Sequence, residues 1–214
     1  MGNDTRGQPY AHPAWRWVGD RGLRVATGEA TLARYCALVS QSFPEIEDLI
    51  PADDSLLLVL RRGKRVSAKL RAMLTTPPAE AQAPTGKLHE IAVEYGGAAG
   101  PDLPALADLA GMSIAAYTNS HSSEEYTVAF LGFQPGFPYL RGLPCALRAP
   151  RRASPRLQVA AGSVAIGGAY TGIYPAAGPG GWQVIGRTTA VLFDPQREAP
   201  ALMMPGDRVR FVPQ

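Results

Sequence analysis

Residues 167–188 read GGAYTGIYPAAGPGGWQVIGRT, and this run decides the fold. Its apolar segments are short and are separated by glycine and proline, and the same pattern recurs through the second half of the chain. Short apolar runs with turn residues between them at intervals of roughly ten residues are typical of β-strands joined by tight turns. We therefore expect residues 87–214 to form a mainly β barrel or sandwich.

The first half of the chain has a different pattern, in which strand-like and helix-like segments alternate. The segments, in order, are RWVGDRGLRVAT (16–27, a strand broken by glycine), ATLARYCALVSQSF (30–43, a helix), SLLLVLRR (55–62, a buried strand) and VSAKLRAMLTT (66–76, a helix). This order predicts a small α+β domain of ferredoxin-like type over residues 14–86. A loose tail at 1–13 and a Pro/Ala linker at 76–86, TPPAEAQAPTG, would flank it.

The second half opens with elements that can be placed individually. HEIAVEYGG (89–97) and EEYTVAFLGF (124–133) are expected strands. PDLPALADLAG (101–111) is an expected helix with Gly100 as its N-cap and with Leu103, Leu106 and Leu109 facing inward. PGDRVRFVP (205–213) predicts a turn followed by a strand that points Val209 and Phe211 to one side.

Composition excludes several classes of protein. The chain has 214 residues, 46% of them hydrophobic, and no apolar run approaches the roughly 20 residues of a membrane helix. The segment MGNDTRGQPYAHP lacks the apolar region of a secretory signal, so we expect a cytoplasmic protein without a membrane partner. Cys36 and Cys145 show no metal-ligand spacing, so neither a disulfide framework nor a metal site is indicated. Lysine is scarce and the arginines alternate with prolines, which argues against nucleic-acid binding.

Charge is distributed unevenly. The stretch 126–193 contains no Asp or Glu but carries Arg141, Arg148, Arg151, Arg152, Arg156 and Arg187. Arginine and the exposed N–H groups of glycine turns bind carboxylate, phosphate and carbonyl oxygens, so we expect an oxygen-rich anionic ligand. Arg151, Arg152, Arg156 and Arg187 are the candidate anion contacts, and Gly136, Gly180 and Gly181 are candidates for backbone N–H contacts.

Aromatic residues accompany these arginines. Prolines 135 and 138 restrict the backbone around Phe133, Phe137 and Tyr139, and the later run alternates aromatic and polar side chains: Tyr170, Thr171, Tyr174, Trp182, Arg187 and Thr188. Two interpretations stay open. The aromatic residues either fill the barrel or form the walls of a ligand pocket with a few fixed polar groups.

A general base must come from outside the acid-free stretch. His121 directly precedes the strand at 124–133 and is the candidate for proton transfer, with a structural role as the alternative. No phosphate-binding GxxxxGK[ST] loop, GxGxxG turn or GxSxG nucleophile motif occurs in the sequence. The chain is therefore not expected to hydrolyse ATP alone.

Three runs carry a resemblance to a known family: FLGFQPGFPYLRGL (130–143), PRRASPRLQVAAGSVAIGGAYTGIYPAAGPGGWQVIGRT (150–188) and PGDRVRF (205–211). They resemble the B-subunit family of bacterial 5-oxoprolinases, also called the PxpB, KipI or allophanate hydrolase subunit 1 family, whose members are carboxyltransferase-domain subunits. The resemblance covers roughly residues 14–214. Tyr170 departs from it, since a glutamine is common at that position.

The resemblance implies a fold and a function. The fold would be a small N-terminal α/β domain followed by a cyclophilin-like β-barrel. Members act with an A subunit and with a C subunit that carries a related barrel, and together they open 5-oxo-L-proline to L-glutamate at the expense of ATP, which would bind at a composite site. Two alternatives follow from other relatives: a carboxyltransferase-type amide-processing subunit, as in biotin-dependent urea carboxylases, and a binding module that inhibits a histidine kinase.

Overall fold

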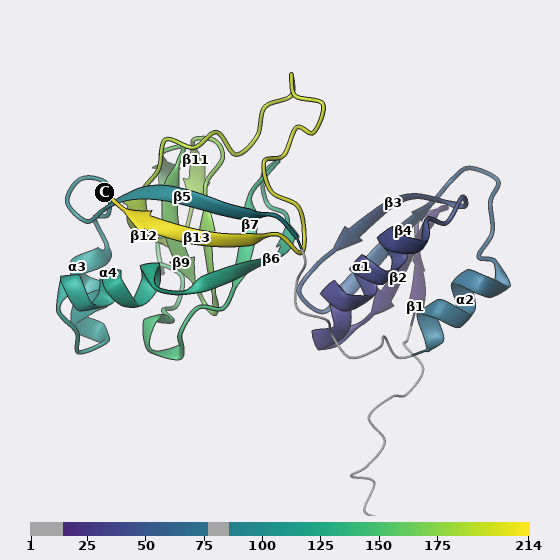
Figure 1. Cartoon of the computed structure of the whole chain (residues 1–214), viewed down its shortest axis with the longest axis horizontal. Helices are drawn as coiled ribbons and strands as arrows, with labels where there is room; N and C mark the ends of the chain where they lie inside the picture. Colours follow the sequence, from purple (N-terminus) through teal and green to yellow (C-terminus); the bar gives the residue numbers. More distant parts are fainter. Residues whose placement is uncertain (1–14, 77–85) are drawn as a thin grey trace, which may run out of the picture. The chain divides into compact units, whose positions relative to one another are not determined.

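The computed structural model describes residues 15–76 and 86–214 (Figure 1). The chain divides into two compact units, residues 1–83 and 84–214. The boundary expected from the sequence, between residues 86 and 87, lies near this division. The expected tail at 1–13 and most of the expected linker at 76–86 lie outside the described residues.

The first unit is a four-stranded antiparallel sheet with two helices. Its sheet has the strand order β1-β2-β4-β3, and α1 lies across one face of it (Figure 1). The elements are β1 (Trp15–Val18), β2 (Gly22–Ala26), α1 (Thr31–Gln41), β3 (Ile46–Pro51), β4 (Ser55–Leu60) and α2 (Ala68–Thr75). The expected single strand at 16–27 is in fact a hairpin, because Gly19 adopts a positive φ of 64° and turns the chain between β1 and β2.

The α+β prediction for this unit is confirmed. Strands β2 and β3 run parallel to each other with β4 between them, and α1 connects them, which is the split β-α-β arrangement of ferredoxin-like folds. Two strands were not expected as separate elements, β1 and β3. The sequence of β3, IEDLIP, carries two acids and a proline, which hide its strand character.

The second unit is a closed barrel, which confirms the expectation of a barrel or sandwich. Its strands follow the order β10-β7-β6-β13-β5-β12-β9, and β10 pairs with β9 to close it. The first and last strands, β5 and β13, pair in parallel, whereas the other neighbours are antiparallel. The barrel strands are β5 (Leu88–Tyr95), β6 (Glu125–Leu131), β7 (Pro138–Arg141), β9 (Ser163–Gly167), β10 (Tyr170–Ile173), β12 (Gln183–Arg187) and β13 (Arg208–Pro213).

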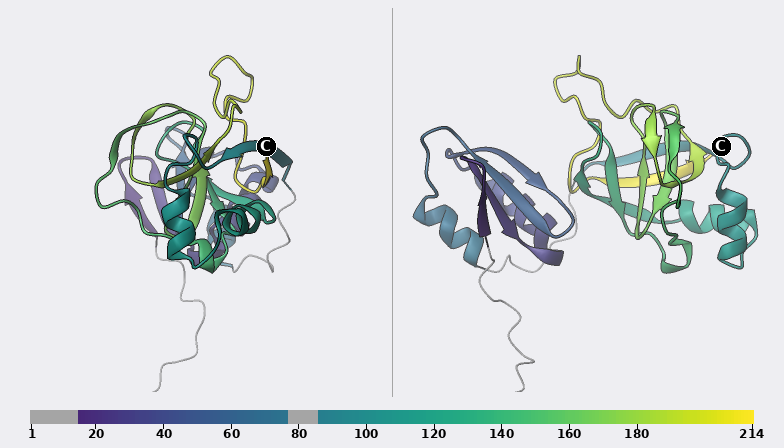
Figure 2. Two further views of the ribbon diagram at one scale, coloured as in Figure 1. Left: turned by 90° about the vertical axis from the view of Figure 1, so that its left-hand side faces the viewer. Right: turned by 180° about the vertical axis from the view of Figure 1, so that it is seen from behind.

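A separate two-stranded ribbon, β8 (Arg156–Val159) and β11 (Gly178–Gly180), accompanies the barrel. In the right-hand view of Figure 2, the light green strands, which belong to the glycine-rich part of the sequence, run steeply across the teal strand β5 and the yellow strand β13. The ribbon comes from the glycine-rich run 167–188 and from the arginine-rich segment before it. It therefore brings together the two segments that the sequence marks as unusual.

Two helices pack on the barrel, α3 (Leu103–Leu109) and α4 (Ile114–Ser122). The N-cap of α3 is Asp102, not Gly100 as expected. Leu103 and Leu106 are buried as expected, but Leu109 is 70% exposed. The expectation for Leu109 was wrong because six residues of helix at 100° each place it on a different face from Leu103.

The barrel interior is filled by side chains that alternate along its strands. In β13, Val209 and Phe211 are 0% and 1% exposed, as expected, while Arg208 and Arg210 point outward to Glu125 at 3.2 Å each. Within the described residues no helix is long and apolar enough to cross a membrane. No cluster of potential metal ligands occurs in residues 15–76 and 86–214.

Candidate functional site

A cavity of about 180 Å³, here called the aromatic pocket, lies beside the β8–β11 ribbon. Its lining residues are Phe133, Phe137, Tyr139, Arg151, Arg152, Pro155, Tyr174, Gly180, Gly181 and Trp182. In β9, Val164 and Ile166 belong to the interior core of the barrel, whereas Ala165 packs in a second cluster with Phe137, Tyr174 and Trp182. Because alternate residues of a strand point to opposite sides, this second cluster lies on the outer face of the barrel.

The rings that form the pocket pack edge to face. Phe137 contacts Trp182 at 5.3 Å and Tyr174 at 5.2 Å between ring centroids, with interplanar angles of 87° in both pairs. Tyr139 meets Trp182 at 5.4 Å and 80°. Edge-to-face pairs at these separations are favourable beyond their burial, so the rings stabilise one another as the walls of the pocket.

Glycines make room for these rings. A Cβ at Gly167 would lie 2.5 Å from the Trp182 ring, and a Cβ at Gly180 would lie 2.4 Å from the Tyr174 hydroxyl. The glycine-rich run therefore has a packing reason at these two positions: each glycine lets an aromatic ring lie directly against the backbone.

The loop between β6 and β7 sets the remaining wall. Phe133 has a φ of 67°, which is unusual for a bulky residue, and the residue is 60% exposed. The ring packs edge-on against Phe137 at 5.5 Å. Gly136, with a φ of 78°, lies so close to Leu192 and Phe193 that a Cβ would fall 2.9 Å from the Phe193 Cβ. A strained aromatic residue at a pocket edge is typical of functional sites.

Two arginines that line the pocket, Arg151 and Arg152, and the neighbouring Arg156 differ in what they bind. Arg152 donates to Asp102 at 3.0 Å, and Arg156 donates to both oxygens of the same carboxylate at 2.8 Å each. Asp102 also accepts the backbone N–H of Val184 at 2.6 Å. Arg151, by contrast, lies over the Trp182 ring at 5.8 Å from its centroid. The carboxylate thus neutralises part of the charge of Arg152 and Arg156 but does not contact Arg151.

The two tyrosine hydroxyls at the pocket stay protonated. Burial raises the pKa of Tyr174 and of Tyr139, and the nearby charge of Arg151 opposes part of that rise in both. Both hydroxyls are therefore neutral hydrogen-bond donors at ordinary pH. They add donor capacity to a site that already contains guanidinium groups.

The pocket collects most of the binding residues expected from the sequence. Those found in its lining are Phe133, Phe137, Tyr139, Arg151, Arg152, Tyr174, Gly180, Gly181 and Trp182. Those outside it are Gly136, Arg156, Tyr170, Thr171, Arg187 and Thr188. Tyr170 packs against Tyr139 at 5.7 Å, next to the pocket, and the Nε of Arg187 donates to the Ala161 carbonyl at 3.3 Å.

Asp102 was not expected at the site. It belongs to the segment before the acid-free stretch, and its sequence separation from Arg152 is 50 residues. No motif or spacing in the sequence attaches a role to it. Although residues 126–193 contain no acid, the folded chain therefore has a carboxylate, that of Asp102, beside the pocket.

His121 lies in the interior of the barrel unit and does not line the pocket. It is 0% exposed, its Nδ1 accepts from the Tyr95 hydroxyl at 2.8 Å, and its Nε2 lies 3.0 Å from Thr171 Oγ1. The Thr171 hydroxyl donates to the Ala165 carbonyl, so it accepts from the Nε2–H of His121. Burial lowers the pKa of His121 to about 3. This geometry supports the structural alternative for His121 and gives no support to a catalytic role.

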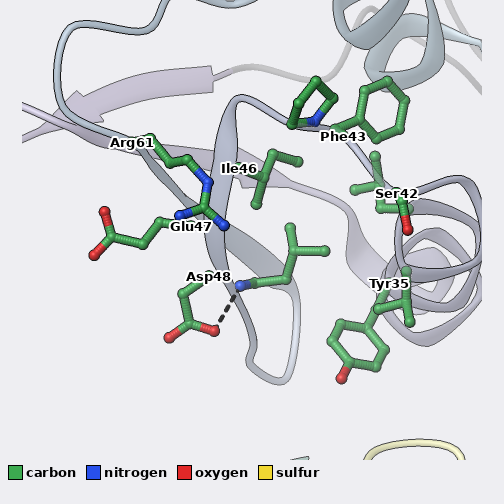
Figure 3. A pocket seen from close by; sticks show the side chains of 11 residues that line it. Tyr35, Ser42, Phe43, Ile46, Glu47, Asp48 and Arg61 are labelled. Carbon is green, nitrogen blue, oxygen red and sulfur yellow. Dashed lines mark hydrogen bonds between the residues drawn. The ribbon is translucent and has the colours of Figure 1, made fainter.

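A larger hollow of about 520 Å³ lies in the first unit, between the end of α1 and β3 (Figure 3). Tyr35 and Ser42 lie on its helix side and Ile46 and Glu47 on its strand side. Glu47 is already paired with Arg21 at 2.6 Å, and none of the expected site residues lies there. Size alone would favour this hollow, but the fixed aromatic and cationic groups favour the aromatic pocket.

Comparison with known proteins defines the class. The family model for the carboxyltransferase domain, subdomain C and D, matches residues 13–203. The match includes every residue that lines the aromatic pocket. The chain therefore belongs to the carboxyltransferase domain family.

The resemblance to the B subunits of 5-oxoprolinases is confirmed by a relative of that name. The 5-oxoprolinase B subunit of Escherichia coli O157:H7 is 51% identical over 173 residues, which is 80% of this chain and 79% of the relative. Within the carboxyltransferase domain family, the chain thus falls in the group of 5-oxoprolinase B subunits.

Solved structures agree with the fold. TTHA0988 is 38% identical with a TM-score of 0.74, and the similarity covers 91% of this chain but only 40% of that one. The urea carboxylase of Kluyveromyces lactis has a TM-score of 0.67 at 21% identity, covering 97% of this chain and 22% of the enzyme. The second likeness establishes the shared fold alone.

Proposed function

We propose that this chain is the B subunit of an ATP-dependent 5-oxoprolinase, which opens 5-oxo-L-proline to L-glutamate only when an A and a C subunit are present. The observation that carries the proposal is the aromatic pocket, in a chain of this family. Its volume of about 180 Å³ lies below the range of roughly 300–1,000 Å³ for drug-sized ligands. A small lactam with one carboxylate suits its aromatic walls, its hydroxyl donors and its arginines.

The same pocket supports a non-autonomous role. Among the residues that line it there is no Asp, Glu or His, and the nearby Asp102 is held by two arginines. Opening a lactam requires proton transfer to its nitrogen and activation of water. We therefore assign those groups to the A or C subunit, and assign binding and orientation of the substrate to this chain.

ATP would bind elsewhere in the composite site. A nucleoside triphosphate is at least the size of the ligands that fill pockets of roughly 300 Å³ or more, so it does not fit within the aromatic pocket of about 180 Å³. The residues of this chain suit the small substrate rather than the nucleotide. The phosphates would be contacted by another subunit.

Reconstitution tests this proposal. The full chain is co-purified with its A and C subunits, and glutamate formation from 5-oxoproline is measured with and without ATP, leaving out one subunit at a time. ATP-dependent glutamate that disappears without this chain supports the proposal. A stable three-subunit complex with no turnover contradicts it and favours another amide or carboxyl-transfer substrate, the alternative to which the urea carboxylase likeness in fold also points.

A histidine-kinase inhibitor remains the other prediction from the resemblance. It would show as inhibition of kinase autophosphorylation by the chain alone, with no turnover in any complex. The same preparations serve for both assays.

A further inference from the structure

We propose that Arg151 is the residue that binds the anionic group of the ligand, and that the aromatic pocket is selective for small monocarboxylates whose flat ring packs among Phe137, Tyr174 and Trp182. The inference rests on the proposed function, because it names the group by which 5-oxoproline would be held. It also makes a claim about the chain by itself, which can be tested without turnover.

The partners of the arginines single out Arg151. Arg156 is bound at 2.8 Å by both oxygens of Asp102, and Arg152 is bound at 3.0 Å by one of them. A carboxylate ligand would have to compete with Asp102 for either of these. Arg151 is exposed, and within residues 15–76 and 86–214 its guanidinium has no hydrogen bond or ion pair to a carboxylate.

The charge of Arg151 reaches the polar groups of the pocket. It stabilises the ionised forms of Tyr139 and Tyr174, which places its positive potential at both hydroxyls. An anion beside these hydroxyls would therefore meet one guanidinium and two neutral donors. Charge-assisted hydrogen bonds of this kind are about twice as strong as those between neutral groups.

The aromatic walls define the rest of the ligand. A box of aromatic rings free of arginine would suit a cation, but here Arg151 already lies over the face of Trp182 at 5.8 Å. A second cation would be repelled, whereas an anion is attracted. The edge-to-face rings of Phe137 and Tyr174 leave apolar surface for a small flat ring.

Arg152 adds a second polar point. Its Nη1 binds Asp102, but its Nε is buried and lacks a hydrogen-bond partner in the part of the chain that the structure describes. Because Arg152 lines the pocket, a turn of its guanidinium would bring this N–H to a neutral acceptor on the ligand, such as a lactam carbonyl. A carboxylate for Arg151 and a carbonyl for Arg152 together describe a cyclic amide acid.

Nuclear magnetic resonance of the full, ¹⁵N-labelled chain tests the inference directly. The chain has three tryptophans, and only Trp182 lies in the barrel unit, so its indole N–H reports on the pocket while Trp15 and Trp17 serve as internal controls. On titration with 5-oxoproline, the Trp182 signal should shift and the other two should not. 2-Pyrrolidone, the same lactam without the carboxylate, should bind about tenfold more weakly or worse.

Single substitutions distinguish the contribution of Arg151 to ligand binding from that of the other arginines. Arg151→Met should weaken 5-oxoproline binding by about ten- to hundredfold while leaving 2-pyrrolidone binding unchanged. Arg148→Met removes an exposed arginine that does not line the pocket, so it should bind like the parent chain. The inference is overturned if Arg151→Met and the parent chain bind 5-oxoproline with equal affinity. It is also overturned if binding is lost in Arg187→Met alone, or if no monocarboxylate shifts the Trp182 signal.

The reconstituted complex distinguishes this inference from the proposed function. Turnover of 5-oxoproline with an unchanged KM in Arg151→Met refutes the inference and leaves the function standing. Carboxylate binding that depends on Arg151, in a chain whose complete complex forms no glutamate, refutes the function and leaves the inference standing.

Discussion

Asp102 and Arg156 form a bidentate ion pair in which each oxygen of the carboxylate lies 2.8 Å from a different guanidinium nitrogen. The hydrogen bond to Asp102 raises the pKa of Arg156 above its ordinary value. The same carboxylate binds Arg152 and the backbone of Val184. One side chain at the start of α3 therefore fixes the ribbon, an arginine loop and a barrel strand relative to one another.

Replacing Asp102 with Asn should destabilise the barrel unit by about 2 kcal/mol. Removing one partner of a fully buried pair costs roughly 3–5 kcal/mol, and the partial exposure of the arginines, 35% and 26%, reduces this. Asp108→Asn, an exposed change in the same helix, should leave the free energy of unfolding within about 0.5 kcal/mol of the parent value. Urea denaturation of both variants checks this, and equal stability would show that the arginines find other partners.

Replacing Thr171 with Val should cost about 2 kcal/mol, because it leaves the buried Nε2–H of His121 without an acceptor. Thr171→Ser keeps the hydroxyl and should recover most of that loss. Guanidinium denaturation of the pair measures the difference. If Ser and Val at this position prove equally stable, the hydrogen bond from His121 contributes nothing.

Acid should destabilise the protein through His121. Its pKa is near 3 in the folded state and near 6.5 when unfolded, so between these values the unfolded chain binds more protons. The stabilisation is complete above pH 6.5 and decreases as the pH falls below it, by about 2 kcal/mol between pH 7 and pH 5.

Unfolding measured at pH 7, 6 and 5 tests this slope. His121→Gln, which does not titrate, should be less stable at pH 7 but should lose stability less steeply toward pH 5. The same steepness in the variant and the parent would assign the acid sensitivity to other groups.

Two adjacent glycines should differ sharply in their tolerance of a methyl group. In Gly180→Ala the new Cβ would lie 2.4 Å from the Tyr174 hydroxyl, so the ring must move and the aromatic pocket must distort. In Gly181→Ala the nearest atom, Pro155 Cγ, is 3.6 Å away, which is an ordinary contact. Melting temperatures should fall by about 4 °C or more for Gly180→Ala, which corresponds to roughly 1 kcal/mol in a unit of this size, and by less for Gly181→Ala. The reverse order would contradict the placement of Tyr174.

The features that could be predicted from the sequence are the local ones. The period-two alternation of β13 predicts that Val209 and Phe211 point into the barrel, and they are buried there. Glycine and proline mark the turns between the barrel strands. The density of aromatic residues among glycines marks Tyr174 and Trp182 as unusual, but it leaves open whether they fill the barrel or line a pocket. Each of these signals comes from residues that are close together in the sequence.

Other features depend on register between distant strands and could not be predicted. Whether an aromatic residue points into the barrel or out of it changes with a shift of one residue, and the outer position of Trp182 follows only from the pairing of β9 with β12. The approach of Asp102 to Arg156 across 54 residues is of the same kind. The sequence could not decide between the catalytic and the structural role of His121, because its partners Tyr95 and Thr171 lie 26 and 50 residues away in the chain.

The parallel pairing of β5 with β13 has a consequence for how the protein forms. Lys87 and Asp207, which are joined by a hydrogen bond of 2.9 Å beside this pairing, are 120 residues apart. The strand β5 therefore has no permanent neighbour on that side until β13 has been synthesised, and barrels with such distant pairings fold slowly. Until β13 has left the ribosome, β5 therefore has an unpaired edge, which is the kind of edge that can pair with another chain.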